Sequence, residues 1–159
     1  MKRVWNITNP AIHSLISFDK EGNLNANICS YVSAISLKPK LYMIAIEKKS
    51  KTHNNLLEND FSILQVLSKK NISLIKKLGK KSGKNFNKFN YLISEKLLSK
   101  WNEKNIIKDT CGIIFLNKIN VFNTIGDHTL FVFKILKTKT ISENNILTFN
   151  KLIDDKIIL

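Results

Sequence analysis

Short apolar runs separated by turn-forming residues recur along this chain. Runs of about four to eight apolar residues predict β-strands. We expect strands over residues 11–18, 25–36, 41–46, 61–67, 106–122 and 129–135, with one further short strand over 146–149. Gly22 separates the first two runs and suits a hairpin turn, because glycine accepts a positive φ. Pro39 lies in the next turn. At that position its missing backbone N–H removes no hydrogen bond between strands.

Helical periodicity is weaker than strand periodicity. Thr52 and Asn71 are the expected N-caps of two short helices, and the second helix is expected to end at Gly79. Residues 97–101 are ambiguous between a short helix and a turn. Strands outnumber helices and are spaced as in an antiparallel barrel with helices at its ends. The pattern therefore predicts a mainly β protein, a β-barrel with peripheral helices, forming a single domain over 1–159.

The charge favours small anionic partners over nucleic acid. The formal net charge is +14, with 26 basic and 12 acidic residues among 159, and the one arginine is Arg3. Arginine is the preferred reader of bases and phosphates, and the lysines here are scattered along the whole chain. We therefore expect no nucleic-acid partner. A strong positive charge still promotes encounter with anionic molecules such as nucleotides.

The residues that commonly carry catalysis are few. Cys29 and Cys111 fit neither a disulfide framework nor a metal site, and His13, His53 and His128 have no metal-ligand spacing, so no metal is expected. Motifs for hydrolysis or phosphoryl transfer are also missing from the sequence, and a reaction whose chemistry a bound cofactor supplies remains open. No apolar run suits a signal peptide or a membrane span, so we expect a cytoplasmic protein without a membrane partner.

The stretch 25–52 offers the most informative pattern. Its first run carries small or hydroxylated residues at Ala26, Ser30, Ser33, Ala34 and Ser36. A strand with so little bulk leaves room for a flat ligand against its backbone. The run Glu47-Lys48-Lys49-Ser50-Lys51-Thr52 supplies lysines, hydroxyls and backbone amides for a phosphate. An ordinary hairpin with a lysine-rich loop remains the alternative.

A second basic segment, residues 80–85, is open to two interpretations. It contains three lysines together with Ser82 and Gly83. It could cover a binding site, or it could be a solvated linker.

These residues resemble a known family. The run from Asn25-Ala26 through Ser30-Tyr31-Val32-Ser33 to Pro39 is similar to the first signature of the flavin reductase-like, FMN-binding split-barrel family. The resemblance continues, in the order of the family, through Thr52-His53, 61–67, 79–89 and 126–131. This chain departs from the family pattern at Ile28, Lys38, Lys40, Gln65 and Phe133-Lys134.

The resemblance implies a flavin site and a role for each site residue. It places the flavin ring against Asn27, Ile28, Cys29, Ser30 and Tyr31, and the phosphate against Lys48, Ser50, Lys51 and Thr52. It makes His128 the candidate for orienting the nicotinamide, although a structural turn histidine explains that residue equally well. Tyr31 is either a flavin neighbour or part of the core.

The resemblance also implies partners and an activity. It predicts FMN, or alternatively FAD, as cofactor, NAD(P)H as co-substrate, a homodimer, and a downstream electron acceptor or monooxygenase. The leading hypothesis is an NAD(P)H-dependent flavin reductase. A non-catalytic flavin-binding or electron-transfer module is the alternative, and a small nucleic-acid-binding barrel is a third hypothesis that rests on charge alone.

Overall fold

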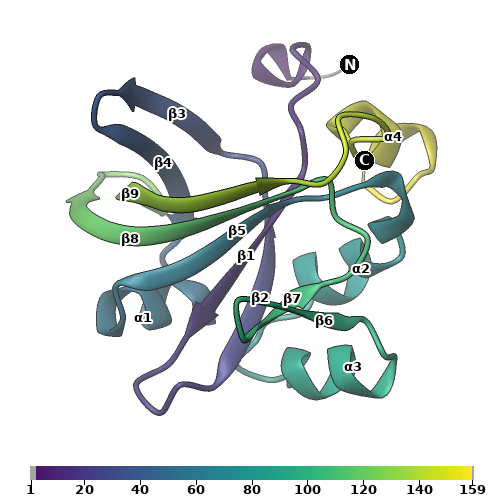
Figure 1. Cartoon of the computed structure of the whole chain (residues 1–159). Helices are drawn as coiled ribbons and strands as arrows, with labels where there is room; N and C mark the ends of the chain where they lie inside the picture. The colour runs from purple at the N-terminus through teal and green to yellow at the C-terminus, as the bar shows by residue number, and fades with distance from the viewer. Residues whose placement is uncertain (1–2, 159) are drawn as a thin grey trace.

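Seven strands form one antiparallel sheet in the order β2-β1-β5-β8-β9-β4-β3 (Figure 1). The computed structural model describes residues 3–158. The strands of this sheet are β1 (His13–Phe18), β2 (Leu24–Cys29), β3 (Val32–Leu37), β4 (Lys40–Glu47), β5 (Phe61–Val66), β8 (Gly112–Asn123) and β9 (His128–Thr140). A separate hairpin pairs β6 (Leu98–Trp101) with β7 (Lys104–Ile107).

Within residues 3–158, four α-helices lie around the sheet. They are α1 (Lys51–Glu58), α2 (Leu74–Gly79), α3 (Lys88–Ser94) and α4 (Phe149–Asp154), and two 3₁₀ turns cover Val4–Asn6 and Lys69–Asn71. Helices α2 and α3 lie with the β6–β7 hairpin on one side of the molecule, and α1 lies below β4 and β5 (Figure 1). The prediction of a mainly β barrel with peripheral helices is confirmed.

The expected strand over 25–36 is two strands. The chain leaves β2 after Cys29 and begins β3 at Val32, and these two strands lie at opposite ends of the sheet order. The sheet must therefore curl until its ends meet at Ser30 and Tyr31, where the Tyr31 carbonyl accepts a hydrogen bond from the Ala45 N–H at 3.0 Å. The crossing of the chain from β2 to β3 at Ser30 and Tyr31 gives the sheet its barrel shape. It also leaves the outer edge of β2 without a partner strand.

Two apolar clusters meet at β1 and β5. The cluster inside the barrel includes Leu15, Ile44, Leu64, Phe131 and the α1 residue Leu56, all buried. On the opposite face, Ile16, Ala26 and Ile63 pack with residues of α2, α3 and the β6–β7 hairpin, namely Leu78, Leu92, Ile106 and Ile107. Helix α1 is thereby anchored on one side of β2 and helices α2 and α3 on the other.

The two predicted N-caps are wrong. Helix α1 is capped by Ser50, whose hydroxyl accepts a hydrogen bond from the His53 N–H at 3.1 Å, and Thr52 lies inside the helix. Asn71 ends a 3₁₀ turn, where its side chain accepts from the backbone N–H of the cap Ser68 at 3.0 Å. Helix α2 begins at Leu74, after its N-cap Ser73, and ends at Gly79 as predicted.

Four further segments differ from the prediction. The region 106–122 is split, because Ile106 and Ile107 belong to β7 of the separate hairpin and β8 begins at Gly112. Residues 97–101, predicted as a helix or turn, contribute strand β6, because Asn102 and Glu103 adopt positive φ values of 45° and 62° and close a tight hairpin. The run 146–149 makes only single-residue bridges, and its last residue begins α4. Helix α3 was not predicted, although its cap Asn87 is a readable signal: its side chain accepts from the Asn90 N–H at 2.9 Å.

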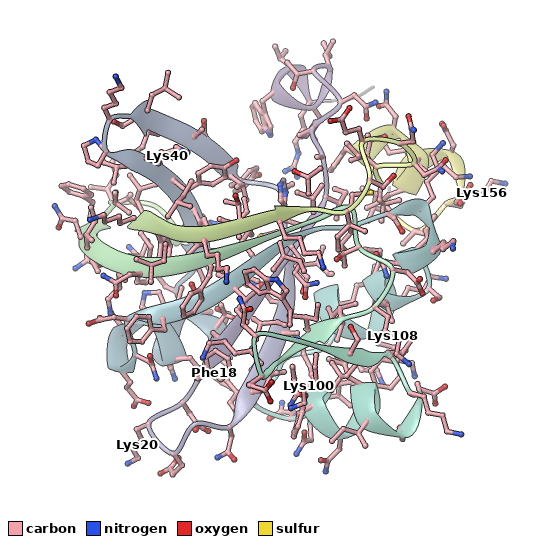
Figure 2. All side chains as sticks on the ribbon, viewed as in Figure 1. Phe18, Lys20, Lys40, Lys100, Lys108 and Lys156 are labelled. Carbon is pink, nitrogen blue, oxygen red and sulfur yellow. The ribbon has the colours of Figure 1, made fainter. Side chains whose placement is uncertain are left out.

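Lysine side chains occur on several sides of the molecule. In Figure 2 the labelled Lys20, Lys40 and Lys156 lie at widely separated edges of the molecule. No helix within residues 3–158 has the length and apolar character needed to cross a membrane. Over the same residues, no group of three or more His, Cys, Asp or Glu side chains could hold a metal ion.

Candidate functional site

A cleft of about 530 Å³ opens beside the end of β2. Its walls come from β2 and the crossing, from the junction of β4 with α1, from the loop between α2 and α3, and from the start of β9. The lining residues are Asn25, Asn27–Tyr31, Ala45–Glu47, Lys49–Thr52, Leu78–Gly83, Lys88 and His128. Its volume lies within the range of about 300–1,000 Å³ that is typical of small-molecule sites.

The first wall is an unpaired strand edge. Strand β2 pairs with β1 alone, so part of its backbone N–H and C=O groups face away from the sheet. Asn27 adds a side-chain acceptor to this wall: its Oδ1 is buried and has no hydrogen-bond partner among the described residues. This edge can therefore pair with a flat ligand that carries alternating donors and acceptors.

The second wall is the start of helix α1. The Ser50 hydroxyl caps the helix, and the first backbone N–H groups of any helix attract anions. Thr52 is buried, and its hydroxyl accepts a hydrogen bond from the Asn25 side chain at 3.0 Å. This bond holds the start of α1 against β2, so that the helix N-terminus and the strand edge face the same cleft.

The third wall is the loop between α2 and α3, and Gly83 lets it approach. A Cβ at Gly83 would lie 2.2 Å from Asn25 Oδ1 and 3.2 Å from Lys51 Cβ. Asn25 cannot easily withdraw, because it is buried and bonded to Thr52. Only a glycine at this position permits the observed contact, which brings Lys80, Lys81 and Ser82 to the cleft.

The cleft is strongly cationic. Five lysines line it against one carboxylate, Glu47; they are Lys49, Lys51, Lys80, Lys81 and Lys88. None of these five takes part in the ion pairs found within residues 3–158. Unpaired charges of one sign in a concave site attract counter-charged ligands. The arrangement is that of a site for an anion.

His128 lies at the mouth of the cleft with a fixed orientation. Its Nδ1 is 2.6 Å from the Asp127 carboxylate, and its ring meets the Tyr31 ring edge-on at 5.4 Å between centroids. The hydrogen bond from His128 lowers the pKa of Asp127, so this carboxylate stays ionised at neutral pH. Because Nδ1 is engaged, Nε2 is the nitrogen left to contact a ligand.

The structure brings together nine of the ten site residues proposed from sequence. Asn27, Ile28, Cys29, Ser30, Tyr31, Ser50, Lys51, Thr52 and His128 all line the cleft. The Cys29 thiol is buried, which raises its pKa to about 12, so it contributes as a small neutral side chain. Residues 80–83 also line the cleft, which favours the covering loop over the solvated linker.

Lys48 is the exception. Its ammonium donates to the backbone carbonyls of Thr124, at 2.6 Å, and Gly126, at 2.7 Å. These bonds direct its charge to the turn between β8 and β9, away from the cleft, so Lys48 does not line the candidate phosphate site.

The individual site residues predicted from sequence do not include Asn25, Lys49 or Lys88. Asn25 stands in the quoted signature, and Lys49 stands in the basic run beside two residues that were assigned. Lys88 lies within residues 79–89 of the family resemblance, but burial of its side chain depends on how α3 packs on β2, which the local sequence does not indicate.

Comparison with known families decides the assignment. Residues 9–152 match a protein family that is described as the flavin reductase like domain. The chain belongs to the flavin reductase-like family. No curated protein sequence matches it significantly.

Solved structures show the same fold. An FMN-binding protein from Thermus thermophilus with bound 1-cyclohex-2-enone has a TM-score of 0.74 at 19% identity, over 88% of this chain and 75% of that one. Flavoredoxin from Methanosarcina acetivorans has a TM-score of 0.73 at 18% identity, over 91% and 75%. An NADH:FAD oxidoreductase from Streptomyces globisporus C-1027, in complex with NAD and FAD fragments, has a TM-score of 0.69 at 14% identity, over 83% and 75%.

The contact at Gly83 gives a test of how this flavin reductase-like cleft is built. Gly83→Ala should force the loop away from Asn25 and raise the rate of tryptic cleavage at Lys80, Lys81 and Lys84 about tenfold, since a local destabilisation of about 1.4 kcal/mol opens the loop ten times more often. Gly126→Ala is the control, because a Cβ there meets only the Thr124 hydroxyl at 3.7 Å. Equal cleavage of the loop in both variants would contradict the proposed packing.

Proposed function

We propose that this protein binds FMN in the cleft and transfers hydride from NAD(P)H to the flavin. The observation that carries the proposal is the juxtaposition, in one cleft, of an unpaired strand edge with unpaired lysines at a helix N-terminus. FMN has the matching chemistry at its two ends: a flat ring with a polar edge, and a phosphate. FAD is the alternative flavin.

The strand edge and the crossing fit the ring. Asn27, Ile28, Cys29, Ser30 and Tyr31 would lie against it, with backbone N–H and C=O groups of β2 opposite the donors and acceptors of the pyrimidine edge. The unpartnered Asn27 Oδ1 supports this fit, since a buried acceptor without a donor costs free energy until it is paired. Cys29 contributes little bulk there, as a flat ligand requires.

The α1 junction fits the phosphate. Ser50, Lys51 and Thr52 would hold it through backbone N–H groups and the Lys51 ammonium, with Lys81 and Ser82 facing them from the opposite loop. A charge-assisted hydrogen bond contributes about 1.5–3 kcal/mol, so two or three of them account for much of a micromolar affinity, about 8 kcal/mol.

The residues of this chain would bind and orient, while the flavin supplies the redox chemistry. When bound, FMN would supply the hydride-accepting chemistry for oxidation of NAD(P)H. His128 Nε2 would hydrogen-bond the carboxamide or a phosphate of NAD(P)H and hold it over the ring. No side-chain base is needed at that step. The reduced flavin would then pass its electrons to a downstream acceptor or a monooxygenase.

A non-catalytic flavin-binding or electron-transfer module is the second candidate. The family favours Gly-Glu after the Gly-Asp-His turn, whereas this chain has Phe133, fully buried in the barrel core, and the exposed Lys134. Flavoredoxin is among the similar folds. Absence of NAD(P)H oxidation by the FMN-loaded protein would favour this candidate over the reductase.

We also propose a homodimer. Large apolar side chains are exposed on β3 and at the β8–β9 end, among them Ile35, Leu37, Phe122 and Ile125. These strands project together from the molecule (Figure 1), and a second copy would cover their apolar surface.

Light scattering of the protein at micromolar concentration should give twice the chain mass of 18.3 kDa. A mass of one chain would contradict the dimer.

FMN should bind saturably, and the loss of Lys51 should affect FMN more than riboflavin. We expect wild-type protein to quench flavin fluorescence at micromolar FMN, and Lys51→Met to weaken FMN about tenfold or more with little effect on riboflavin, which has no phosphate. The control is Lys76→Met, which removes the same charge from an exposed position outside the cleft lining. Equal losses for both ligands would contradict the phosphate site, and no saturation at tens of micromolar FMN would contradict flavin binding.

His128→Ala should raise the KM for NAD(P)H and leave FMN affinity nearly unchanged. Loss of one orienting hydrogen bond corresponds to about 1.4 kcal/mol, roughly a tenfold change. Steady-state kinetics at saturating FMN measure this effect. His53→Gln is the control, because His53 bonds Thr129 Oγ1 at 2.9 Å and is not among the lining residues. An unchanged KM in His128→Ala would make His128 a turn residue only.

A further inference from the structure

Lys88 is a buried lysine in the wall of the cleft. Its exposed fraction is 5%, and its ammonium donates to the Leu78 carbonyl at 2.5 Å. A lysine ammonium has three N–H donors, and no ion pair found within residues 3–158 involves this one. The other lining lysines are at least partly exposed, so water screens their charge more effectively.

The environment of Lys88 disfavours its charge. Burial lowers the pKa of Lys88 to about 8, so the side chain is still mostly protonated at pH 7. A buried cation without an anionic partner is costly to the fold, and it becomes more stable when negative charge enters the same low-dielectric region. The position is therefore suited to respond to the charge of a ligand.

Lys88 lies beside the strand edge. Its acceptor Leu78 precedes Gly79, the last residue of α2, and a Cβ at Gly79 would lie 3.4 Å from Ile28 Cβ. Ile28 belongs to the part of β2 against which the flavin ring would lie, whereas the phosphate would lie at Ser50, Lys51 and Thr52. The Lys88 ammonium is thus associated with the ring end of the cleft.

We propose that Lys88 is the residue that makes the cleft bind reduced FMN more tightly than oxidised FMN, by stabilising the negative charge that the ring gains on reduction. This inference rests on the proposed flavin site. Reduction by two electrons and one proton adds one unit of negative charge to a ring that is neutral when oxidised. Charge placed near the ring is one of the means by which a protein tunes the electronics of a flavin.

A structural role for Lys88 makes a different prediction. The bond to Leu78 joins residues on either side of the loop between α2 and α3, so Lys88 could serve only to hold that loop in place. A role limited to this would affect oxidised and reduced FMN equally. Lys88→Gln separates the two roles, because glutamine retains a donor for the Leu78 carbonyl but carries no charge.

The test is the midpoint potential of bound FMN, measured at pH 7 in wild type, Lys88→Gln, Lys88→Met and Lys88→Arg. In Lys88→Gln and Lys88→Met, we expect the ratio of affinities for reduced over oxidised FMN to fall at least tenfold. A tenfold fall lowers the two-electron midpoint potential by about 30 mV. Lys88→Arg should stay close to wild type. Lys81→Gln is the matched control: it removes an exposed lysine from the same cleft and should shift the potential less.

Each outcome distinguishes this inference from the proposed function. Binding of FMN by the wild type with an unchanged potential in Lys88→Gln would overturn the role of Lys88 and leave the flavin site standing. A shift of the midpoint potential in Lys81→Gln as large as that in Lys88→Gln would assign the effect to the general charge of the cleft. That result would also overturn the role of Lys88. Failure of the wild type to bind FMN at all would overturn both. If Lys88→Met does not fold, the Lys88→Gln and Lys88→Arg pair decides the question.

Discussion

The unpaired edge of β2 is the feature on which the candidate site depends. It exists because the chain turns away from β2 at Ser30 and Tyr31 and begins β3 at the other end of the sheet. An exposed strand edge can pair with the strand of another chain and so promote aggregation, unless other residues cover it. Here the α2–α3 loop and the start of α1 approach the edge from two sides and leave a cleft between them. The same geometry that closes the barrel thus creates backbone donors and acceptors for a ligand.

A small polar network holds the walls of this cleft together. Asn25 bonds Thr52 in α1, and the absence of a side chain at Gly83 lets the loop come against Asn25. Three segments distant in sequence therefore meet around one buried amide. Because this amide is fully enclosed, its hydrogen bond is more valuable than one in water, and its loss would leave polar groups unpaired.

Much of this arrangement could be predicted from the sequence, and what could not has a physical cause. Strand positions followed from apolar runs, and the candidate residues at Asn27–Tyr31 and Ser50–Thr52 followed from a low-bulk strand, a basic loop and a family resemblance. The break at Ser30 could not be predicted, because residues 25–36 form one continuous run without glycine or proline.

Lys48 illustrates a second limit of prediction from sequence. It is chemically equivalent to Lys49 and Lys51, and only the position of the β8–β9 turn, fixed by tertiary structure, directs it away from the cleft. Lys88 is likewise buried by the packing of α3, which no local pattern reveals.

Hydrogen–deuterium exchange with and without FMN tests the central claim most directly, because it reports which backbone amides a ligand covers. If FMN pairs with the free edge of β2, saturating FMN should slow exchange in residues 25–31, 50–52 and 79–83 together, and the β6–β7 hairpin, none of whose residues line the cleft, should be unaffected. Protection confined to another part of the molecule, or no protection at saturating FMN, would contradict the account.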